Sequence, residues 1–335
     1  MTLHPSVAAV RQGVRRVLGE IADTPQQPTV LVACSGGADS LALLSAVVFE
    51  GHRADRGGPD VRVIGVTVDH GLQDGSAEHA ARVVAQMAAM RADETASARV
   101  VVESEGRGTE AAAREARYAV LDQMTEHFGA SLVLLGHTRD DQAETVLLGL
   151  TRGSGGRSLA GMRRSFDAYR RPLLDVGRAD TVTACQVEGL DFWEDPHNLD
   201  PAFARSRVRH TVLPLLEEEL GPGVAAALAR TADQLREDAD LLDGLGDGAY
   251  AEVRADGGID AAALARHPVA VAHRVLRLAA LEAGSPAAEL FRVHVLALAA
   301  LAGPQPRPRE VQLPGRLTAT RDGDLLTFGP TPVEG

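Results

Sequence analysis

A short loop near the start of the chain has the residue types that bind phosphate groups. It consists of Ser35, Gly36, Gly37, Ala38, Asp39 and Ser40. The two glycines let the backbone approach an anion and adopt dihedral angles that a side chain would forbid. The serines add hydroxyl donors, and the carboxylate of Asp39 can hold a divalent cation that bridges phosphates. The loop predicts a phosphate site, whereas the plainer alternative is a glycine-rich turn whose Asp39 and Ser40 only cap a helix.

A second polar segment follows the apolar strand that we predict at residues 132–135. Asp141 and Glu144 are three residues apart on the helix that comes next, so their carboxylates can share one face. Paired carboxylates in a cleft suit an ammonium group or a metal ion. Thr138 as N-cap, with Asp140 and Asp141 complementing the helix dipole, is the alternative, and the two roles are compatible.

Basic side chains near these two segments could neutralise phosphates. His137 ends its strand at the edge where ligands bind such sheets, which favours a phosphate contact or an acid–base role. Arg114, on a predicted helix face, is the better candidate than Arg117 to neutralise a polyphosphate. An Arg-Gly run at residues 152–164 and a later arginine cluster could contact a nucleic-acid backbone, or could be solvated surface. The cluster comprises Arg205, Arg207 and Arg209.

The elements that position these side chains alternate between apolar runs and helical segments. We expect strands at residues 30–34, 61–68, 99–103 and 132–135, and helices at residues 3–22, 41–48, 76–90, 109–126 and 142–150. This order predicts an α/β fold with a doubly wound parallel sheet, whose right-handed crossovers place helices on both faces. The polar segments after the first, second and fourth strands then meet at one edge of the sheet.

The rest of the chain has a different pattern, which predicts a second domain. Residues 1–215 are assigned to the first domain, with its core at 28–215, and residues 216–335 to a mostly helical domain with a small β tail. Helical periodicity covers residues 224–245, 261–283 and 288–301. In the tail, apolar segments at 317–321 and 325–328 flank Asp322-Gly323, which is a hairpin signal.

Composition limits the classes of protein that the chain can belong to. Its 335 residues have a net charge of −12, which argues mildly against nucleic acid, although the local distribution of charge matters more. Cys34 and Cys185 are the only cysteines, so neither a disulfide framework nor a zinc site is plausible. No apolar run approaches a membrane span, and we expect a cytoplasmic protein without a membrane partner. All 34 Lys+Arg residues are arginine, so lysine chemistry needs lysine from outside.

An ordered set of motifs resembles the tRNA(Ile)-lysidine synthetases of the N-type ATP pyrophosphatase superfamily. The resemblance covers about residues 30–215, and His197 and Ser206 depart from the pattern of the family. The motifs are the Ser35–Ser40 loop, Val68-Asp69-His70-Gly71-Leu72, residues 110–118, residues 136–145, Arg152-Gly153-Ser154-Gly155-Gly156, Leu159-Ala160-Gly161-Met162, Arg171-Pro172-Leu173-Leu174, residues 192–198 and residues 205–209.

The resemblance implies a Rossmann-like pyrophosphatase fold, ATP and Mg²⁺ as cofactors, and a two-step reaction on RNA. ATP would adenylate the C2 oxygen of the wobble cytidine in a tRNA(Ile) with a CAU anticodon and release pyrophosphate. The amine of free L-lysine would then attack C2, expel AMP and form lysidine. The target base must leave its stack to enter the pocket. A homodimer is left open.

The same resemblance implies a role for individual residues. Asp39, Arg114 and His137 would be catalytic, and Asp39 would also lie next to Mg²⁺. Asp141 and Glu144 would bind the substrate lysine. The residues that would bind tRNA are Arg205, Arg207 and Arg209. Those that would bind ATP are Ser35, Gly36, Gly37, Ala38, Asp39, Ser40, Val68 and His70.

Three other functions remain open from the sequence. An amidotransferase or RNA-thiolating enzyme of the same fold is disfavoured by the small number of cysteines. A nucleotide-binding module without turnover would not need the polar residues after the fourth strand or the Arg-rich segments. A metal-dependent hydrolase using Asp140, Asp141 and Glu144 is disfavoured because no second histidine lies nearby in the sequence.

Overall fold

Two compact units make up the chain in the computed structural model. The structure describes residues 3–22, 24, 26–53, 60–69, 71, 75–100, 109–152, 156–195, 199–305 and 309–331. The first unit comprises Met1–Leu148 and Gly161–Arg230, and the second comprises Gly149–Ala160 and Thr231–Gly335. The functional division at residues 215 and 216 stays a prediction, because a unit of packing need not coincide with a unit of function.

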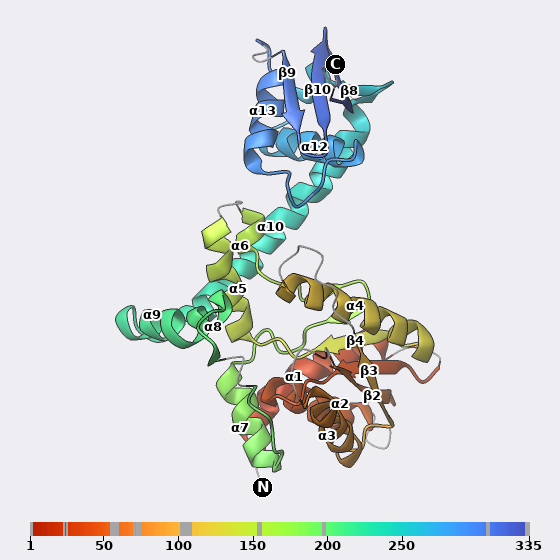
Figure 1. Cartoon of the computed structure of the whole chain (residues 1–335), viewed down its shortest axis with the longest axis vertical. Helices are drawn as coiled ribbons and strands as arrows, with labels where there is room; N and C mark the ends of the chain where they lie inside the picture. Colours follow the sequence, from red (N-terminus) through yellow and green to blue (C-terminus); the bar gives the residue numbers. More distant parts are fainter. Residues whose placement is uncertain are drawn as a thin grey trace. The chain divides into compact units, whose positions relative to one another are not determined.

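A six-stranded sheet forms the centre of the first unit (Figure 1). Its order is β3-β2-β1-β4-β6-β5, and every pair is parallel except β5 with β6. The predicted parallel sheet is therefore confirmed. The strands are β1 (Thr29–Ala33), β2 (Arg62–Asp69), β3 (Glu94–Arg99), β4 (Leu132–Leu135), β5 (Ser165–Phe166) and β6 (Tyr169–Arg170).

Helices cover both faces of this sheet, as a doubly wound fold requires. Val30 and Val32 of β1 belong to one apolar cluster with side chains of α1, α2, α3 and α7. Leu31 points the other way and packs with Leu121 of α4. The bounds are α1 (Pro5–Leu18), a 3₁₀ turn η1 (Gly19–Ile21), α2 (Ala38–Gly51), α3 (Ser76–Ala89), α4 (Thr109–Phe128) and α7 (Arg178–Glu188).

The structure differs from the predicted strands in two places: one predicted strand is shifted, and one hairpin was not predicted. The third strand is Glu94–Arg99, not residues 99–103, of which 101–103 lie outside the described residues. This strand lies at the edge of the sheet with partly exposed side chains, so it lacks the apolar run that marks a buried strand. The β5–β6 hairpin was not predicted, because its strands have two residues each and Asp167 turns the chain with a φ of 45°.

A buried carboxylate of α2, that of Glu50, forms an ion pair with α1. The Glu50 side chain is 2% exposed and accepts hydrogen bonds from Arg15 at 2.8 and 2.9 Å and from Arg53 at 2.7 Å. Burial by itself would raise the pKa of Glu50, but the two guanidinium groups hold it below its usual value.

We expect Glu50→Ala to lower the free energy of unfolding by about 2 kcal/mol, because both arginines lose a desolvated partner. Chemical denaturation measures this loss. Glu94→Ala is the matched control, since Glu94 pairs with Arg62 at a surface where both side chains are more than 40% exposed. Its cost should stay below about 0.5 kcal/mol. Equal losses for the two variants would contradict the role assigned to burial.

The last part of the first unit is a series of short helices. They are α8 (Ala204–Arg207), the π-helical turn η4 (Val208–Val212) and α9 (Leu213–Glu219). Leu213 packs with Ala143 of α5 (Arg139–Arg152) and with Ala225 at the start of α10 (Val224–Val253). These contacts place η4 beside the first turns of α5.

The second unit combines helices with a five-stranded antiparallel sheet in the order β7-β8-β11-β10-β9. The predicted hairpin is confirmed, with Asp322 opposite Leu325. The short strands β7 and β8 were missed because only Ile259 in them is a buried apolar residue. The elements are α6 (Gly156–Leu159), β7 (Arg254–Ala255), β8 (Gly258–Asp260), α11 (Ala261–Leu264), α12 (Val269–Glu282), α13 (Arg292–Ala302), β9 (Glu310–Leu313), β10 (Leu317–Asp322) and β11 (Leu325–Pro330). Among the described residues, no helix has the length and apolar character needed to cross a bilayer.

Candidate active site

The predicted phosphate loop lies between β1 and α2, but it is shorter than the sequence suggested. Helix α2 begins at Ala38 with Gly37 as its N-cap residue, so Asp39 and Ser40 belong to its first turn. The helix was predicted to begin at residue 41 because its polar first turn shows no apolar periodicity. The Ser40 hydroxyl accepts from the Ser35 N–H at 3.1 Å and donates to the Gly37 carbonyl at 2.9 Å. Ser40 therefore holds the loop closed, while Ser35 is exposed.

Two residues to which the sequence assigned no role, His79 and Trp193, hold the outside of this loop. The backbone N–H of Trp193 donates to the Gly36 carbonyl at 2.9 Å, and His79 Nε2 lies 2.9 Å from the Ser35 carbonyl oxygen. The His79 and Trp193 rings are 4.0 Å apart. Gly36 has a φ of +83°, and a Cβ there would lie 2.7 Å from Val83 Cγ2. Only glycine fits this position without strain.

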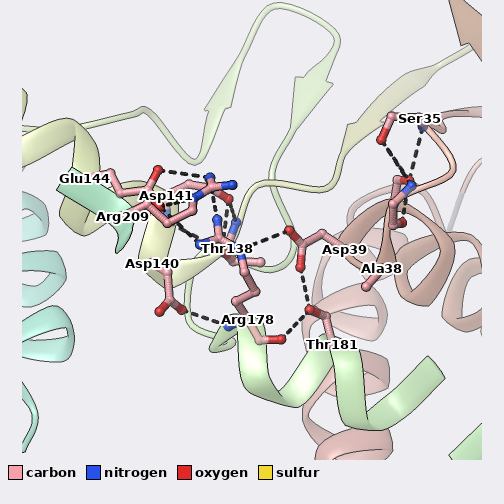
Figure 2. Close-up of polar contacts among 12 residues, drawn as sticks. Ser35, Ala38, Asp39, Thr138, Asp140, Asp141, Glu144, Arg178, Thr181 and Arg209 are labelled. Carbon is pink, nitrogen blue, oxygen red and sulfur yellow. Dashed lines mark hydrogen bonds and ion pairs between the residues drawn. The ribbon is translucent and has the colours of Figure 1, made fainter. Parts of the chain in front are cut away.

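Asp39 points from the loop toward the first turn of α7 (Figure 2). Its carboxylate accepts a hydrogen bond from the Thr181 hydroxyl and lies 3.6 Å from Nε of Arg178. Burial raises the pKa of Asp39 to about 6, although Arg178 and Thr181 act in the opposite direction. The ionised group is therefore undercompensated, and an additional cation would stabilise it.

We compare the free energy of unfolding of Asp39→Asn with that of the wild type, both without ligand. We expect the difference to favour the variant more at pH 8 than at pH 5. The raised pKa means that Asp39 contributes most to stability below about pH 4, where it is protonated in both states. That contribution is lost as the pH rises through about 6. The variant should gain on the order of 1 kcal/mol between the two pH values, because asparagine stays neutral and part of the wild-type loss has already occurred at pH 5. Thermal unfolding at both pH values measures the gain, and a pH-independent difference would contradict it.

The carboxylates of Asp141 and Glu144 lie together at the start of α5, as predicted. The Asp141 N–H donates to the Thr138 hydroxyl at 3.4 Å, and the Thr138 N–H and hydroxyl donate to Asp141 Oδ2 at 2.8 and 2.9 Å, so the capping role is confirmed as well. Asp140 takes a separate role, because its Oδ2 accepts from the N–H of Arg178 at 2.8 Å. Asp141 is 6% exposed and Glu144 is fully buried.

Three guanidinium groups surround the two carboxylates (Figure 2). Asp141 Oδ1 accepts from Arg178 at 2.8 Å and from Arg205 and Arg209 at 3.1 Å each. Glu144 accepts from the same three arginines at 3.1, 2.8 and 2.7 Å. Burial would raise the pKa of Asp141, but Arg178 and Arg205 hold it well below its usual value. We call these five residues the arginine–carboxylate cluster.

The cluster contains Arg205 and Arg209, which the sequence assigned to tRNA binding, and also Arg178, which it did not assign. Arg178 reaches Asp39, Asp141 and Glu144, and so connects the phosphate loop to the carboxylate pair. No spacing rule could have identified Arg178, because its partners lie more than 30 positions away in the sequence. The exposed Arg207 is outside the cluster and donates to the carbonyls of Pro201 and Ala202.

The remaining predicted residues lie on different elements of the first unit. His137 lies two residues after the end of β4, and its Nδ1 is 3.2 Å from Nε of Arg171. Desolvation lowers the pKa of His137 to about 3, so the ring is neutral near pH 7. The exposed Arg114 donates to the Tyr118 hydroxyl at 3.3 Å, beside a cavity of about 480 Å³. Val68 is half-buried near the end of β2, whereas His70 lies outside the described residues.

The donor set at Asp39 fits a cation that is shared with a phosphate. Among the described residues, no group of three or more His, Cys, Asp and Glu side chains could hold a metal ion alone. Mg²⁺ in phosphate-transfer sites commonly takes one or two carboxylates, with phosphate oxygens and water completing its coordination. The undercompensated charge of Asp39 matches that arrangement.

The parallel sheet and its glycine loop define a PP-loop protein of the ATP pyrophosphatase class. A family model described as a PP-loop domain matches residues 10–216. A solved structure, U34-tRNA thiolase NcsA from Methanococcus maripaludis, covers 69% of this chain and 80% of its own with a TM-score of 0.54. At 17% identity, that likeness shows the fold alone.

Curated relatives narrow the class to one family. The tRNA(Ile)-lysidine synthase of Streptomyces coelicolor is 49% identical over 97% of this chain and 98% of its own. The enzyme of the same name from Thermobifida fusca is 50% identical over 96% of this chain and 97% of its own. The chain belongs to the tRNA(Ile)-lysidine synthase family.

Proposed function

We propose that this protein ligates lysine to the wobble cytidine of a tRNA(Ile) with a CAU anticodon, at the expense of ATP. One observation carries the proposal. Arg178 contacts both Asp39, next to the phosphate loop, and the buried pair Asp141 and Glu144. The proposed nucleotide site and the proposed site for the lysine ammonium groups would therefore be contiguous. A reaction that joins an adenylated base to an amine needs this arrangement, because holding two reactants together supplies much of the rate enhancement.

In the first step, the phosphate loop would hold the pyrophosphate end of ATP, and Mg²⁺ would be held next to Asp39. The backbone N–H groups at the start of α2 and the helix dipole suit this negative charge. Bound Mg²⁺ would neutralise phosphate charge. Arg114 and the neutral His137 would act on the α-phosphate, where charge develops as pyrophosphate leaves.

In the second step, Asp141 and Glu144 would bind the ammonium groups of free L-lysine. The cluster already binds cations, since three guanidinium groups lie against these carboxylates. Lysine would take the place of a guanidinium. Arg205 and Arg209, released from the carboxylates, could then contact the phosphates of the tRNA. Arg178 would stay, because its guanidinium also lies 3.6 Å from Asp39.

Other parts of the proposal concern the whole molecule. The second unit, together with Arg207, would contribute to tRNA binding. The cytoplasm is the expected location, since the substrates ATP, lysine and tRNA meet there. A homodimer remains a prediction, to be tested by the molar mass in solution.

The decisive experiment measures two products in one assay. Full-length protein is incubated with ATP, Mg²⁺, labelled lysine and a tRNA(Ile) transcript carrying either a CAU or another anticodon. We expect labelled lysine in the CAU transcript only, with AMP and pyrophosphate released in step. Equal incorporation of lysine into transcripts with either anticodon would refute the proposal. So would the absence of lysine incorporation into a well-folded CAU transcript.

The same assay separates the alternatives. RNA-dependent pyrophosphate release without lysine incorporation would indicate another AMP-forming enzyme on this fold. ATP binding without any turnover would indicate a binding module. Hydrolysis of ATP in the absence of RNA would indicate a hydrolase.

A further inference from the structure

A buried arginine that the proposed mechanism does not use lies behind His137. Arg171 follows β6 directly and is 5% exposed. Its Nη2 donates to the Tyr118 hydroxyl at 3.1 Å, and its Nη1 donates to the carbonyl of Arg163. Its third contact joins Nε to Nδ1 of His137 at 3.2 Å. The guanidinium also lies over the Phe166 ring, 4.8 Å from its centroid.

The chemistry of the two side chains fixes the direction of the contact between Arg171 and His137. A guanidinium has N–H donors and no acceptor, and it does not deprotonate in proteins. Nδ1 of His137 must therefore accept the hydrogen bond and carry no proton. A neutral imidazole has one proton, which is then on Nε2. The low pKa of His137 agrees with a neutral ring, because desolvation, with a contribution from Arg171, disfavours the cation.

We propose that Arg171 is a positioning residue that holds His137 in its Nε2–H tautomer, so that the ring offers the nucleotide a hydrogen-bond donor. Among the described residues, none makes a hydrogen bond with Nε2 of His137, and we assign this N–H to the nucleotide. An acceptor nitrogen at that point would repel a phosphoryl oxygen, whereas an N–H stabilises the charge that develops there. The kinetic consequence, but not the tautomer, rests on the proposed function.

The tautomer can be read directly in the ligand-free wild-type protein. Full-length protein is labelled with ¹⁵N in its histidine rings, and the His137 signals are assigned by their loss in His137→Gln. We expect an unprotonated Nδ1 and a protonated Nε2 at pH 7.5. A protonated Nδ1 in the wild-type protein would overturn the inference, whatever reaction the protein catalyses.

Three variants test whether Arg171 is responsible. Arg171→Met places a methyl group at the position of Nε, keeps most of the side-chain length and removes the donor. We expect a marked population of the Nδ1–H tautomer and an adenylation rate about tenfold lower, with the KM for lysine within about twofold of wild type. Arg171→Gln returns an amide nitrogen to the same position and should recover part of the Nε2–H signal.

Tyr118→Phe is the matched control, because it removes another partner of the guanidinium and leaves the contact with His137 intact. Its His137 tautomer should match the wild type. A folded Arg171→Met protein with an unchanged tautomer would overturn the inference. If that variant does not fold, the wild-type spectrum and Tyr118→Phe still decide. Failure of the proposed function is distinct, since it appears as wild-type protein that releases no pyrophosphate with RNA and lysine.

Discussion

Glu144→Gln should raise the KM for lysine by about 10- to 100-fold and leave the KM for ATP within about twofold of wild type. A charge-assisted hydrogen bond between an ammonium group and a buried carboxylate is worth about 1.5–3 kcal/mol, which corresponds to this range. The substitution keeps the shape of the side chain but removes its charge. It also leaves three guanidinium groups facing one carboxylate, which further disfavours a new cation.

Glu144 is a cleaner test than Asp141, because Asp141 Oδ2 also caps α5 through Thr138. Steady-state kinetics with lysine as the varied substrate measure the effect. Asp140→Asn is the matched control, since Asp140 lies in the same helical turn but bonds the backbone of Arg178 instead of a guanidinium. A normal KM for lysine in Glu144→Gln, or an equal change in Asp140→Asn, would remove the carboxylate pair from lysine binding.

Gly36→Ala should reduce kcat/KM for ATP at least about 100-fold. An alanine at a φ of +83° costs roughly 1–2 kcal/mol in the backbone. Its Cβ would also lie 2.7 Å from Val83 Cγ2, and a β-branched side chain on a helix has little freedom to move away. Relief of the backbone strain and relief of the contact with Val83 both move the loop from the position set by His79 and Trp193.

Binding of a non-hydrolysable ATP analogue, measured by calorimetry, shows whether the loss is in binding. Gly19→Ala is the control, because Gly19 has a φ of −61° and an added Cβ meets nothing within 4 Å. We expect that variant to bind the analogue like the wild type. Normal affinity in Gly36→Ala would mean that the nucleotide phosphates lie elsewhere.

Local features of the site could be predicted because their determinants are close in the sequence. The strand, glycine loop and helix around Gly36 occur within about 20 residues, and the spacing of Asp141 and Glu144 places both on one helix face. The start of α2 was set too late only because its first turn is polar. Periodicity indicates which side chains face a core, and the parallel sheet follows from that pattern.

The partners of these groups could not be predicted, because they come from distant segments. Arg178, Arg205 and Arg209 reach the carboxylates through α7, α8 and η4, and nothing in their spacing specifies that meeting. The sequence favoured solvent or nucleic acid for Arg205 and Arg209, which is the usual surrounding of exposed arginines. Their pairing with acidic groups depends on the packing of Leu213, which follows η4, against Ala143 of α5.

The composition of the arginine–carboxylate cluster determines how it can be opened. Guanidinium groups keep their charge at any pH at which the protein is folded, and this chain has no lysine of its own to substitute for them. Protonation therefore cannot loosen the cluster until its carboxylates titrate, far below neutrality. An incoming cation can exchange with an arginine, so under the proposed function the supply of free lysine, rather than acidity, would govern access to the carboxylates.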